Sequence, residues 1–334
     1  MKVAVIGSGG WGTALAVMLA NNGHDIDLWS FEDAEYERLS RDRENKMFLP
    51  GVYFPDNIDC TTDISVAKDA EVVVMAVPSF AVRATARKLS AYITDNHIVV
   101  NVAKGIEKDT SLRLSEIIEE ELAGKGKIVV LSGPSHAEEV GRGVPTAIIA
   151  TSKHKDAAET VQDVFMNDRF RVYVTDDVVG VELGAALKNV MALAAGVCDG
   201  LGLGDNAKAA LMTRGLAEMI RLGLALGGKE ETFSGLAGLG DLIVTCMSMH
   251  SRNRRAGILI GKGHSIDEAI KEVGAVVEGY YATQSAMELA KKVSVEMPIT
   301  EEVYKILFEN ANAEESLLRL MQREKKSESE TAWK

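Results

Sequence analysis

A lone lysine interrupts a long apolar stretch of the sequence. Between Leu183 and Cys198, Lys188 is the only charged side chain. Burial there would strip water from its ammonium group and lower its pKa towards neutrality, so that it could take the proton of an alcohol during oxidation. The alternative is a lysine whose stem covers apolar surface while its charge reaches water. Adjacent Asn189 and small residues such as Gly184 favour the first interpretation, because they leave room for a ligand.

A second group of polar residues follows further along the chain. The glycine-rich segment Gly235-Leu236-Ala237-Gly238-Leu239-Gly240 ends at Asp241, and Ser251-Arg252-Asn253-Arg254-Arg255 comes shortly after it. Asp241 could hold an ammonium group or a substrate hydroxyl, and Arg252 with Asn253 could bind a phosphate. The two segments together predict a phosphorylated substrate. The alternatives are that Asp241 is a helix N-cap and that Arg254 and Arg255 are surface charges.

Two turns in the first half of the chain are expected at the carboxyl edge of a parallel sheet, where ligands bind in such folds. Lys104, in Ala103-Lys104-Gly105, could bind a substrate oxyanion or phosphate. The turn Gly133-Pro134-Ser135-His136-Ala137 offers backbone N–H groups and a hydroxyl. His136 fits a catalytic role or a structural one equally well.

The chain opens with a glycine turn, Gly7-Ser8-Gly9-Gly10-Trp11-Gly12, placed between an apolar strand and an amphipathic stretch over residues 13–21. In this context Gly7 permits a tight turn, Gly9 lets the backbone approach a pyrophosphate, and Gly12 lets helix and strand pack closely. The helix N-terminus adds free N–H groups for the anion. The turn therefore predicts a dinucleotide site, with a turn that holds no ligand as the alternative.

Selectivity between NAD and NADP is open at the end of the second strand. NAD-selective sites often carry an acidic residue there, whereas this chain reads Ser30-Phe31 before Glu32 and Asp33. Ser30 could bind a 2′-phosphate, while Glu32 or Asp33 could reach a ribose hydroxyl. Positive charge could come from nearby arginines, namely Arg38, Arg41 and Arg43.

Short β-branched runs alternate with helical stretches through the first half of the chain, at residues 3–6, 25–29, 72–77, 98–102, 128–131, 147–150 and 172–174. This order predicts a Rossmann-like, largely parallel sheet with helices on both faces. From about Val178 the apolar spacing becomes helical, and Thr175-Asp176-Asp177 is a plausible helix start. We expect an α/β dinucleotide-binding domain over residues 1–177 and an all-α catalytic domain over residues 178–334.

Composition limits the class of protein. The net charge of −12 disfavours a surface built to bind nucleic acid. Three scattered cysteines fit a reducing compartment, and the strand that starts at Val3 leaves no room for a signal peptide, so we expect a soluble, cytoplasmic protein whose mature chain begins at residue 1. We expect no membrane span, because the apolar run around Lys188 is too short. The six histidines show no metal-ligand spacing, so no metal site is predicted, and the tail over residues 323–334 is expected to be solvated and poorly ordered.

The motifs as a set closely resemble the NAD(P)-dependent sn-glycerol-3-phosphate dehydrogenases over nearly the whole chain. The resemblance rests on their order and spacing: Gly7-Ser8-Gly9-Gly10-Trp11-Gly12-Thr13-Ala14-Leu15-Ala16, Ala103-Lys104-Gly105, Gly133-Pro134-Ser135-His136-Ala137, Leu187-Lys188-Asn189, Gly238-Leu239-Gly240-Asp241-Leu242 and Ser251-Arg252-Asn253. It implies the reversible interconversion of dihydroxyacetone phosphate and sn-glycerol 3-phosphate with NADP or NAD, as a supply of phospholipid precursor.

The resemblance also implies roles for individual residues. Lys188 is the expected proton acceptor. The expected substrate contacts are Lys188 itself together with Lys104, Gly133, Ser135, Asp241, Ser251, Arg252 and Asn253. Lys104 and Arg252 would also touch the cofactor. The other residues expected on the dinucleotide, beside Gly7, Gly9 and Gly12, are Gly10, Trp11, Phe31, Ala137, Val276 and Glu278.

Two positions depart from the family. Phe31 stands where relatives that prefer NADP commonly have a polar or basic residue, and Gly10 stands where serine is frequent.

Alternatives to the family assignment are a sibling dehydrogenase of the β-hydroxyacid or 6-phosphogluconate type and a nicotinamide-binding sensor without chemistry. The Ser251-Arg252-Asn253 segment favours a small phosphorylated triose over the sibling substrates, and Lys188 disfavours a sensor. A homodimer is expected, because helical second domains of this kind often carry a dimer interface.

Overall fold

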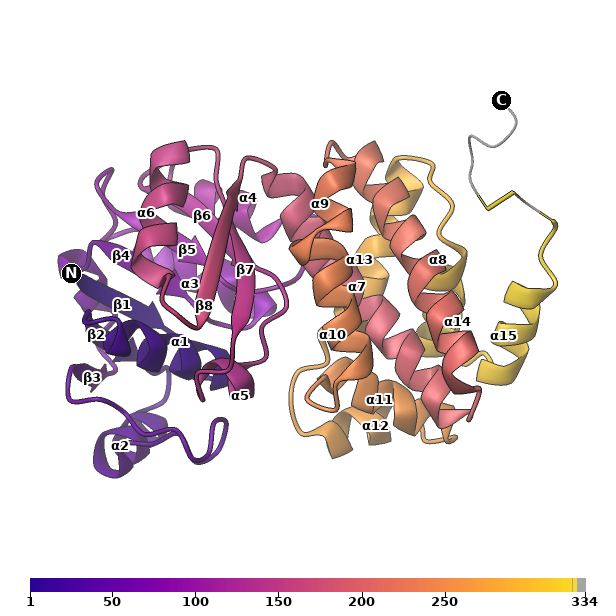
Figure 1. Ribbon diagram of the computed structural model, residues 1–334, viewed down its shortest axis with the longest axis horizontal. Coiled ribbons are helices and arrows are strands. Elements are labelled where there is room, and N and C mark those ends of the chain that lie inside the picture. Colours follow the sequence, from indigo (N-terminus) through magenta and orange to yellow (C-terminus); the bar gives the residue numbers. More distant parts are fainter. Residues whose placement is uncertain (326, 329–334) are drawn as a thin grey trace.

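The computed structural model describes residues 1–325, 327 and 328, and shows an α/β unit followed by a helical unit (Figure 1). Strands alternate with helices as far as β8 (Phe170–Thr175). From α7 (Val178–Gly200) onward, every element in the described residues is helical. The predicted tail over residues 323–334 is described only in part, since residues 326 and 329–334 lie outside the described residues.

The described part of the α/β unit contains one eight-stranded sheet in the order β3-β2-β1-β4-β5-β6-β7-β8. All neighbouring strands are parallel except β6 and β7, so the expected largely parallel sheet is confirmed. The strands are β1 (Lys2–Ile6), β2 (Asp25–Trp29), β3 (Ile58–Thr61), β4 (Val72–Met75), β5 (Ile98–Asn101), β6 (Lys127–Ser132), β7 (Thr146–Thr151) and β8 (Phe170–Thr175). The edge strand β3 is missing from the predicted set, because its four residues, Ile-Asp-Cys-Thr, include only one large apolar side chain.

Helices cover both faces of this sheet. In β4, Val72 and Val74 pack in the cluster that contains α1 and α6, whereas Val73 and Met75 pack in the cluster that contains α3 and α4. The strand is therefore apolar on both sides, as expected for a central parallel strand. The helices of this unit are α1 (Gly10–Asn21), α2 (Asp33–Asp42), α3 (Val82–Leu89), α4 (Leu114–Glu121), α5 (Ala137–Val140) and α6 (Lys155–Phe165), with 3₁₀ turns η1 (Ile64–Asp69) and η2 (Ser79–Ala81).

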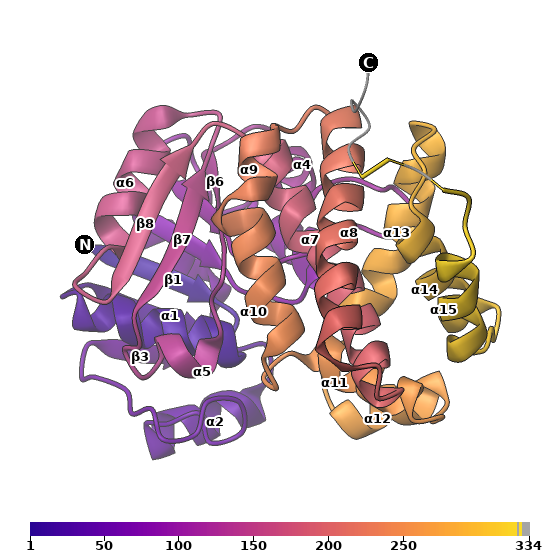
Figure 2. The ribbon, with the colours of Figure 1, turned by 45° about the vertical axis from the view of Figure 1, so that its right-hand side comes forward.

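The helical unit is built around α7. Its other elements are α8 (Gly204–Ala225), α9 (Glu230–Ser234), the π-helical turn η3 (Leu236–Gly240), α10 (Asp241–Met247), α11 (Arg252–Gly261), α12 (Ile266–Val273), α13 (Glu278–Lys292), α14 (Pro298–Phe308) and α15 (Ala313–Met321). The helical unit meets the sheet where α7 and η3 pack against β6 and β7 (Figure 2).

Helix α7 begins at the predicted place and is buried along most of its length. Asp177 caps it, since its Oδ1 accepts a hydrogen bond from Gly180 N at 2.9 Å, and its Oδ2 accepts one from Lys229 N at 2.9 Å. The expectation that this apolar run is too short to cross a membrane is wrong, because α7 is long and apolar enough to do so. However, 89% of its most apolar window is buried inside the protein. Burial of this kind is typical of the central helix of a domain.

Small residues let other backbone segments approach α7. A Cβ on Gly196 would lie 2.1 Å from the Arg254 carbonyl oxygen in α11, and a Cβ on Gly184 would lie 2.8 Å from the Ala237 carbonyl oxygen in η3. The expectation that Gly184 leaves room for a ligand is wrong, because the backbone of η3 fills the space beside it. Close packing of η3 and α10 on α7 brings Asp241 next to Lys188.

Candidate active site

The turn between β1 and α1 has the geometry that a dinucleotide requires. Gly7 has a φ of 120°, and a Cβ on Gly12 would lie 1.9 Å from the Gly7 carbonyl oxygen, so strand and helix are too close there for any side chain. A Cβ on Gly9, in contrast, would meet no atom within 4 Å. The backbone in front of the α1 N-terminus is therefore open to a pyrophosphate, and the three glycines have the geometries of the three roles expected for them.

Buried polar side chains hold this turn in place. Asn45 Nδ2 donates hydrogen bonds to the Ser8 carbonyl oxygen at 2.7 Å and to Thr13 Oγ1 at 2.9 Å. Ser30 Oγ donates to Ser8 Oγ at 2.8 Å. Because these groups satisfy one another beneath the turn, its outer N–H groups remain directed to a ligand.

Lys188 and Asp241 form the centre of the site. Lys188 Nζ donates to Asp241 Oδ1 at 2.7 Å and to Thr245 Oγ1 at 2.6 Å, while Lys104 Nζ donates to Asp241 Oδ2 at 2.7 Å. The side chain of Lys188 is 7% exposed, and that of Asp241 is 1% exposed. Lys188 therefore does not extend its charge into water, and Asp241 holds two ammonium groups instead of capping a helix.

Burial and charge tune both members of this pair. Burial lowers the pKa of Lys188 from 10.5 to about 8, with Lys104 adding to the effect and Asp241 opposing it. Burial also disfavours the charged form of Asp241, but Lys104 and Lys188 outweigh it, so the pKa of Asp241 lies below its ordinary value. The site thus pairs an ionised carboxylate with a lysine that can exchange a proton near neutral pH.

Thr245 is a site residue that was not predicted from the sequence. It lies one helical turn after Asp241 in α10, and its hydroxyl donates to the Asp241 carbonyl oxygen at 2.6 Å while accepting from Lys188. The i, i+4 spacing from Asp241 is the signal that could have identified it, because residues at this spacing share a helix face. Thr245 fixes the direction of the Lys188 ammonium group.

The residues expected to bind phosphate gather at the start of α11. Ser251 caps this helix, its Oγ accepting from Arg254 N, and Arg252 is solvent-exposed. Asn253 is buried, donating from Nδ2 to Asn189 Oδ1 at 2.9 Å and accepting at Oδ1 from Gly279 N at 2.8 Å. A helix N-terminus with a serine cap and an adjacent arginine suits an anion. Arg254 is not a surface charge as considered above, since it pairs with Asp199 at 2.7 Å.

The turn after β6 contacts Lys104, which in turn contacts Asp241 at the centre of the site. The Gly133 carbonyl oxygen accepts from Lys104 Nζ and from Ser135 Oγ, each at 2.9 Å, and Ala137 begins α5. His136 Nε2 is buried without a hydrogen-bond partner among the described residues. Burial lowers the pKa of His136, and Lys188 and Lys104 add to this effect.

The remaining residues expected on the cofactor lie in two places. Trp11 packs partly buried against the core near the glycine turn, while Phe31 is 71% exposed, with the Lys88 Nζ 5.0 Å from its ring centroid. Val276 lies just before α13, and Glu278 is the first residue of that helix. Glu278 Oε2 accepts from Ser79 Oγ at 2.7 Å, a contact between the two units that the sequence analysis missed, because 199 residues separate the partners.

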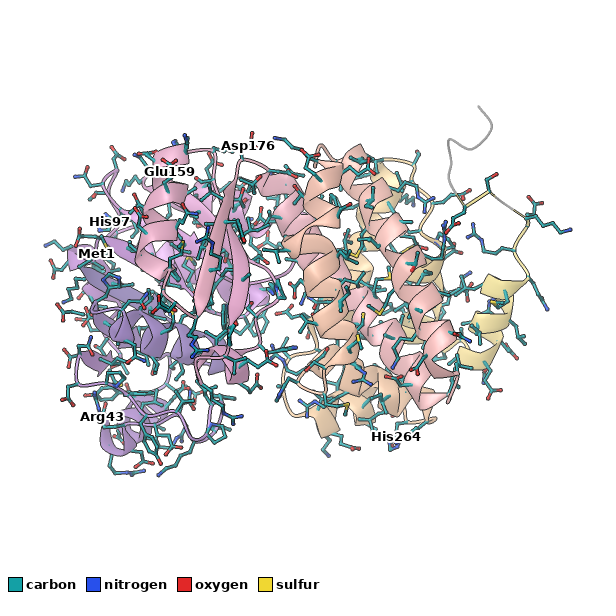
Figure 3. The ribbon with its side chains drawn as sticks, viewed as in Figure 1. Met1, Arg43, His97, Glu159, Asp176 and His264 are labelled. Atoms are coloured by element: carbon teal, nitrogen blue, oxygen red, sulfur yellow. The ribbon has the colours of Figure 1, made fainter. Side chains whose placement is uncertain are left out.

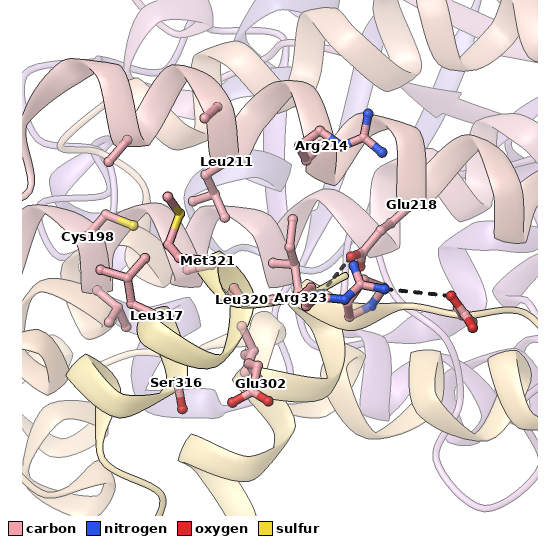
Figure 4. Close-up of a pocket in the computed structure, with 18 of the residues that line it drawn as sticks. Cys198, Leu211, Arg214, Glu218, Glu302, Ser316, Leu317, Leu320, Met321 and Arg323 are labelled. Carbon is pink, nitrogen blue, oxygen red and sulfur yellow. Dashed lines mark hydrogen bonds and ion pairs between the residues drawn. The ribbon is translucent and has the colours of Figure 1, made fainter. Parts of the chain in front are cut away.

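No cluster in the described residues could hold a metal ion. His97 lies in the α/β unit and His264 in the helical unit (Figure 3), while the rings of His136 and His250 lie 5.6 Å apart between their centroids. A cavity of about 1050 Å³ lies between α7, α8, α14 and α15 and includes none of the predicted site residues (Figure 4). The candidate active site is therefore the region around Lys188 and Asp241, which Lys104 connects to the edge of the sheet.

A glycine turn for a dinucleotide, together with a buried lysine supplied by a second, helical unit, defines a nicotinamide-dependent dehydrogenase. Residues 2–158 match the family described as NAD-dependent glycerol-3-phosphate dehydrogenase N-terminus, and residues 177–318 match the corresponding C-terminus. The chain belongs to the NAD-dependent glycerol-3-phosphate dehydrogenase family.

Individual relatives agree with this assignment. The chain is 55% identical over 330 residues to a glycerol-3-phosphate dehydrogenase (NAD(P)+) of Fusobacterium nucleatum, covering 98% of each chain. It is 56% identical over 329 residues to one from a Thermoanaerobacter species, covering 98% of this chain and 99% of the relative. The crystal structure of a glycerol-3-phosphate dehydrogenase from Coxiella burnetii matches with a TM-score of 0.93 at 39% identity, covering 96% of this chain and 99% of the other. The expected oxidoreductase function with NAD or NADP is confirmed.

Proposed function

We propose that Lys188 is the general acid and base in the interconversion of sn-glycerol 3-phosphate and dihydroxyacetone phosphate. The observation that carries this role is its buried ammonium group, held by Asp241 and Thr245, whose pKa is lowered to about 8. A lysine in this state exists in both protonation forms near neutral pH, as a reversible reaction requires. Asp241 and Thr245 act as positioning residues.

The proton balance follows from these contacts. When bound, the nicotinamide cofactor supplies or accepts a hydride at the substrate carbon. In the oxidation, neutral Lys188 accepts the proton of the C2 hydroxyl at Nζ while that carbon loses its hydride. In the reduction, the Lys188 ammonium group donates a proton to the carbonyl oxygen. Asp241 and Thr245 remain hydrogen-bonded to Nζ in both directions and keep it aimed at the substrate.

The other expected contacts surround this centre. We propose that the substrate phosphate binds at the start of α11, on Ser251, Arg252 and Asn253, and that Lys104, Gly133, Ser135 and Asp241 contact the rest of the substrate. The dinucleotide would bind on the glycine turn at Gly7, Gly9, Gly10, Trp11 and Gly12, with Phe31, Lys104, Ala137, Arg252, Val276 and Glu278 as further contacts. The open face of Gly9 and the exposure of Arg252 support this arrangement.

One assay tests the reaction. Dihydroxyacetone phosphate is offered with NADH and with NADPH in separate reactions, and oxidation is followed as loss of absorbance near 340 nm. We expect turnover with at least one of them and none with 6-phosphogluconate and the oxidised cofactors. Failure to oxidise either reduced cofactor would refute the proposed function.

A second assay tests the phosphate contact. Arg252→Ala should raise the KM for dihydroxyacetone phosphate about 10- to 100-fold, because a hydrogen bond to a charged group contributes about 1.5–3 kcal/mol. Arg171→Ala, which removes an exposed arginine from β8, is the control and should leave KM unchanged. A normal KM in the Arg252 variant would contradict the phosphate site.

We further propose that the product serves phospholipid synthesis, that the protein is cytoplasmic, and that the two domains meet at residues 177 and 178. The change from strands to helices at this point supports the boundary. Cell fractionation tests the location, and separate expression of residues 1–177 with a measurement of NADH binding tests the boundary.

We propose a homodimer in which a second copy covers the cavity beside α15. Leu317, Leu320 and Met321 contribute apolar surface there (Figure 4). The exposed Arg214 and Glu324, which also line the cavity, supply both signs of charge. A patch that carries both signs can pair with itself across a twofold axis. Light scattering should give twice the chain mass, and Met321→Glu should reduce it to one chain. Met47→Glu, at a methionine of similar exposure in the α/β unit, is the control.

A further inference from the structure

The end of β2 lies beside the glycine turn, where a dinucleotide fold places the adenosine ribose. Ile6 and Trp29 are partners in the β1–β2 register, so the residues that follow each strand come together. Ser8, inside the turn, is the point of contact. The group that faces the ribose 2′ position therefore comes from residues 30–35.

Ser30 is not available to a 2′-phosphate. Its side chain is fully buried, and its Oγ donates to Ser8 Oγ at 2.8 Å. Each hydroxyl carries a single hydrogen, so Ser30 has none left to donate to a phosphate oxygen. The possibility that Ser30 selects NADP, left open by the sequence, is excluded by this hydrogen bond.

The side chain of Glu35, in the first turn of α2, lies near Ser8. Glu32, Asp33 and Glu37 are exposed, whereas Glu35 is half-buried, with its carboxyl group near the Ser8 hydroxyl. Burial raises the pKa of Glu35, and Ser8 and the charge of Arg38 oppose that shift. The carboxyl group thus lies against the glycine turn instead of extending into solvent with its neighbours.

The charges around this position are mostly negative. Glu32 and Asp33 lie at the start of α2, within one turn of Glu35. A 2′-phosphate would add a charge of about −1.5 to −2 beside them. The opposing cations are Arg38 on α2 and Lys88 from α3, whose Nζ lies over the Phe31 ring. Residual binding of a 2′-phosphate would depend on these two cations.

We propose that Glu35 makes this dehydrogenase selective for NAD(H) over NADP(H). Its carboxylate accepts hydrogen bonds from the ribose hydroxyls of NADH and repels the 2′-phosphate of NADPH. The relatives that the chain matches are named for both cofactors, so membership of the family does not by itself decide the preference. The proposal rests on the proposed cofactor site at the glycine turn.

Titration calorimetry without substrate tests the preference directly. We expect the Kd of NADPH to exceed that of NADH at least tenfold in the unaltered protein. Glu35→Gln, which keeps the shape and removes the charge, should tighten NADPH and weaken NADH until the two Kd values differ less than about threefold. Glu37→Gln, on the exposed side of the same helix, should keep the original ratio. Lys88→Met should weaken NADPH further and leave NADH unchanged.

A measurement that needs no variant gives an independent check. If repulsion excludes the 2′-phosphate, added salt screens it, and the ratio of the NADPH Kd to the NADH Kd should fall as ionic strength rises. A rising ratio would mean that cations attract the 2′-phosphate, which overturns the proposal. Equal affinity for both cofactors, or an unchanged ratio in Glu35→Gln, would overturn it as well. Failure of both cofactors to bind would refute the proposed cofactor site itself.

Discussion

Lys188, Lys104 and Asp241 form a group in which Lys188 and Asp241 are buried and Lys104 is half-buried. When both lysines are protonated, the group carries one more positive than negative charge. Such a group is costly to bury unless its members are hydrogen-bonded, and all three are. Its excess positive charge disposes the site to receive an anionic substrate. The burial that lowers the Lys188 pKa is therefore part of the same arrangement that attracts a phosphorylated triose.

Replacing Lys188 tests its role at the level of one residue. Lys188→Ala should lower kcat about 10²- to 10⁴-fold, the usual contribution of a positioned acid or base, and leave the Kd of the reduced cofactor nearly unchanged. Steady-state rates and calorimetry measure the two effects. Lys262→Ala, at an exposed lysine after α11, is the control. Near-normal turnover in a folded Lys188→Ala protein would remove Lys188 from the mechanism.

The pH dependence of kcat/KM should have opposite signs for reduction of dihydroxyacetone phosphate and oxidation of sn-glycerol 3-phosphate. Reduction needs the Lys188 ammonium group, so its kcat/KM should fall as pH rises through about 8. Oxidation needs the neutral amine, so its kcat/KM should fall as pH drops through the same value. Thr245→Val removes a hydrogen bond that favours the ammonium form, and the inflection should move to lower pH. If the inflection in the pH profile of kcat/KM stays at the same pH in Thr245→Val, the positioning role of Thr245 is contradicted.

At the scale of elements, the sequence predicts those turns, strands and helix starts that are determined by a few neighbouring residues. The glycine turn, β2 and the start of α7 were all predicted, because turn glycines, β-branched runs and an N-terminal cap act over a few residues. β3 could not be predicted, since four residues at a sheet edge are held mainly by pairing with β2. The role of Gly184 was misjudged because its partner, Ala237, belongs to a distant turn.

Two glycines of one turn should respond differently to the same methyl group. In Gly12→Ala the Cβ would meet the Gly7 carbonyl oxygen, and overpacking of this kind costs about 1–3 kcal/mol or more of folding free energy. In Gly9→Ala the Cβ meets no protein atom, so stability should change by about 1 kcal/mol or less. That methyl group would instead occupy the space of the pyrophosphate, and the Kd of NADH should rise at least tenfold. Equal melting temperatures in the two variants would disprove this separation of roles.

At the scale of the whole molecule, polar contacts join the two units along one seam. Besides Lys104 with Asp241 and Ser79 with Glu278, Ser111 Oγ donates to Glu288 at 3.0 Å and Arg113 Nη1 donates to Glu182 at 2.8 Å. The partners are separated by 69 to 199 residues. The sequence predicts candidate site residues one by one, but it could not pair them, because this pairing exists only once the helical unit has packed on the sheet.

Glu182 is the best place to test how strongly the seam holds. It is buried in α7 and accepts hydrogen bonds from Ser115 N at 2.8 Å and from Arg113, so its removal leaves buried donors without a partner. Glu182→Ala should lower the free energy of unfolding by about 3 kcal/mol. Glu116→Ala removes a more exposed partner of the same arginine and the capping contact to Arg113 N at the start of α4, and should cost about 1 kcal/mol. Chemical denaturation measures both, and equal losses would show that the buried contact does not hold the two units together.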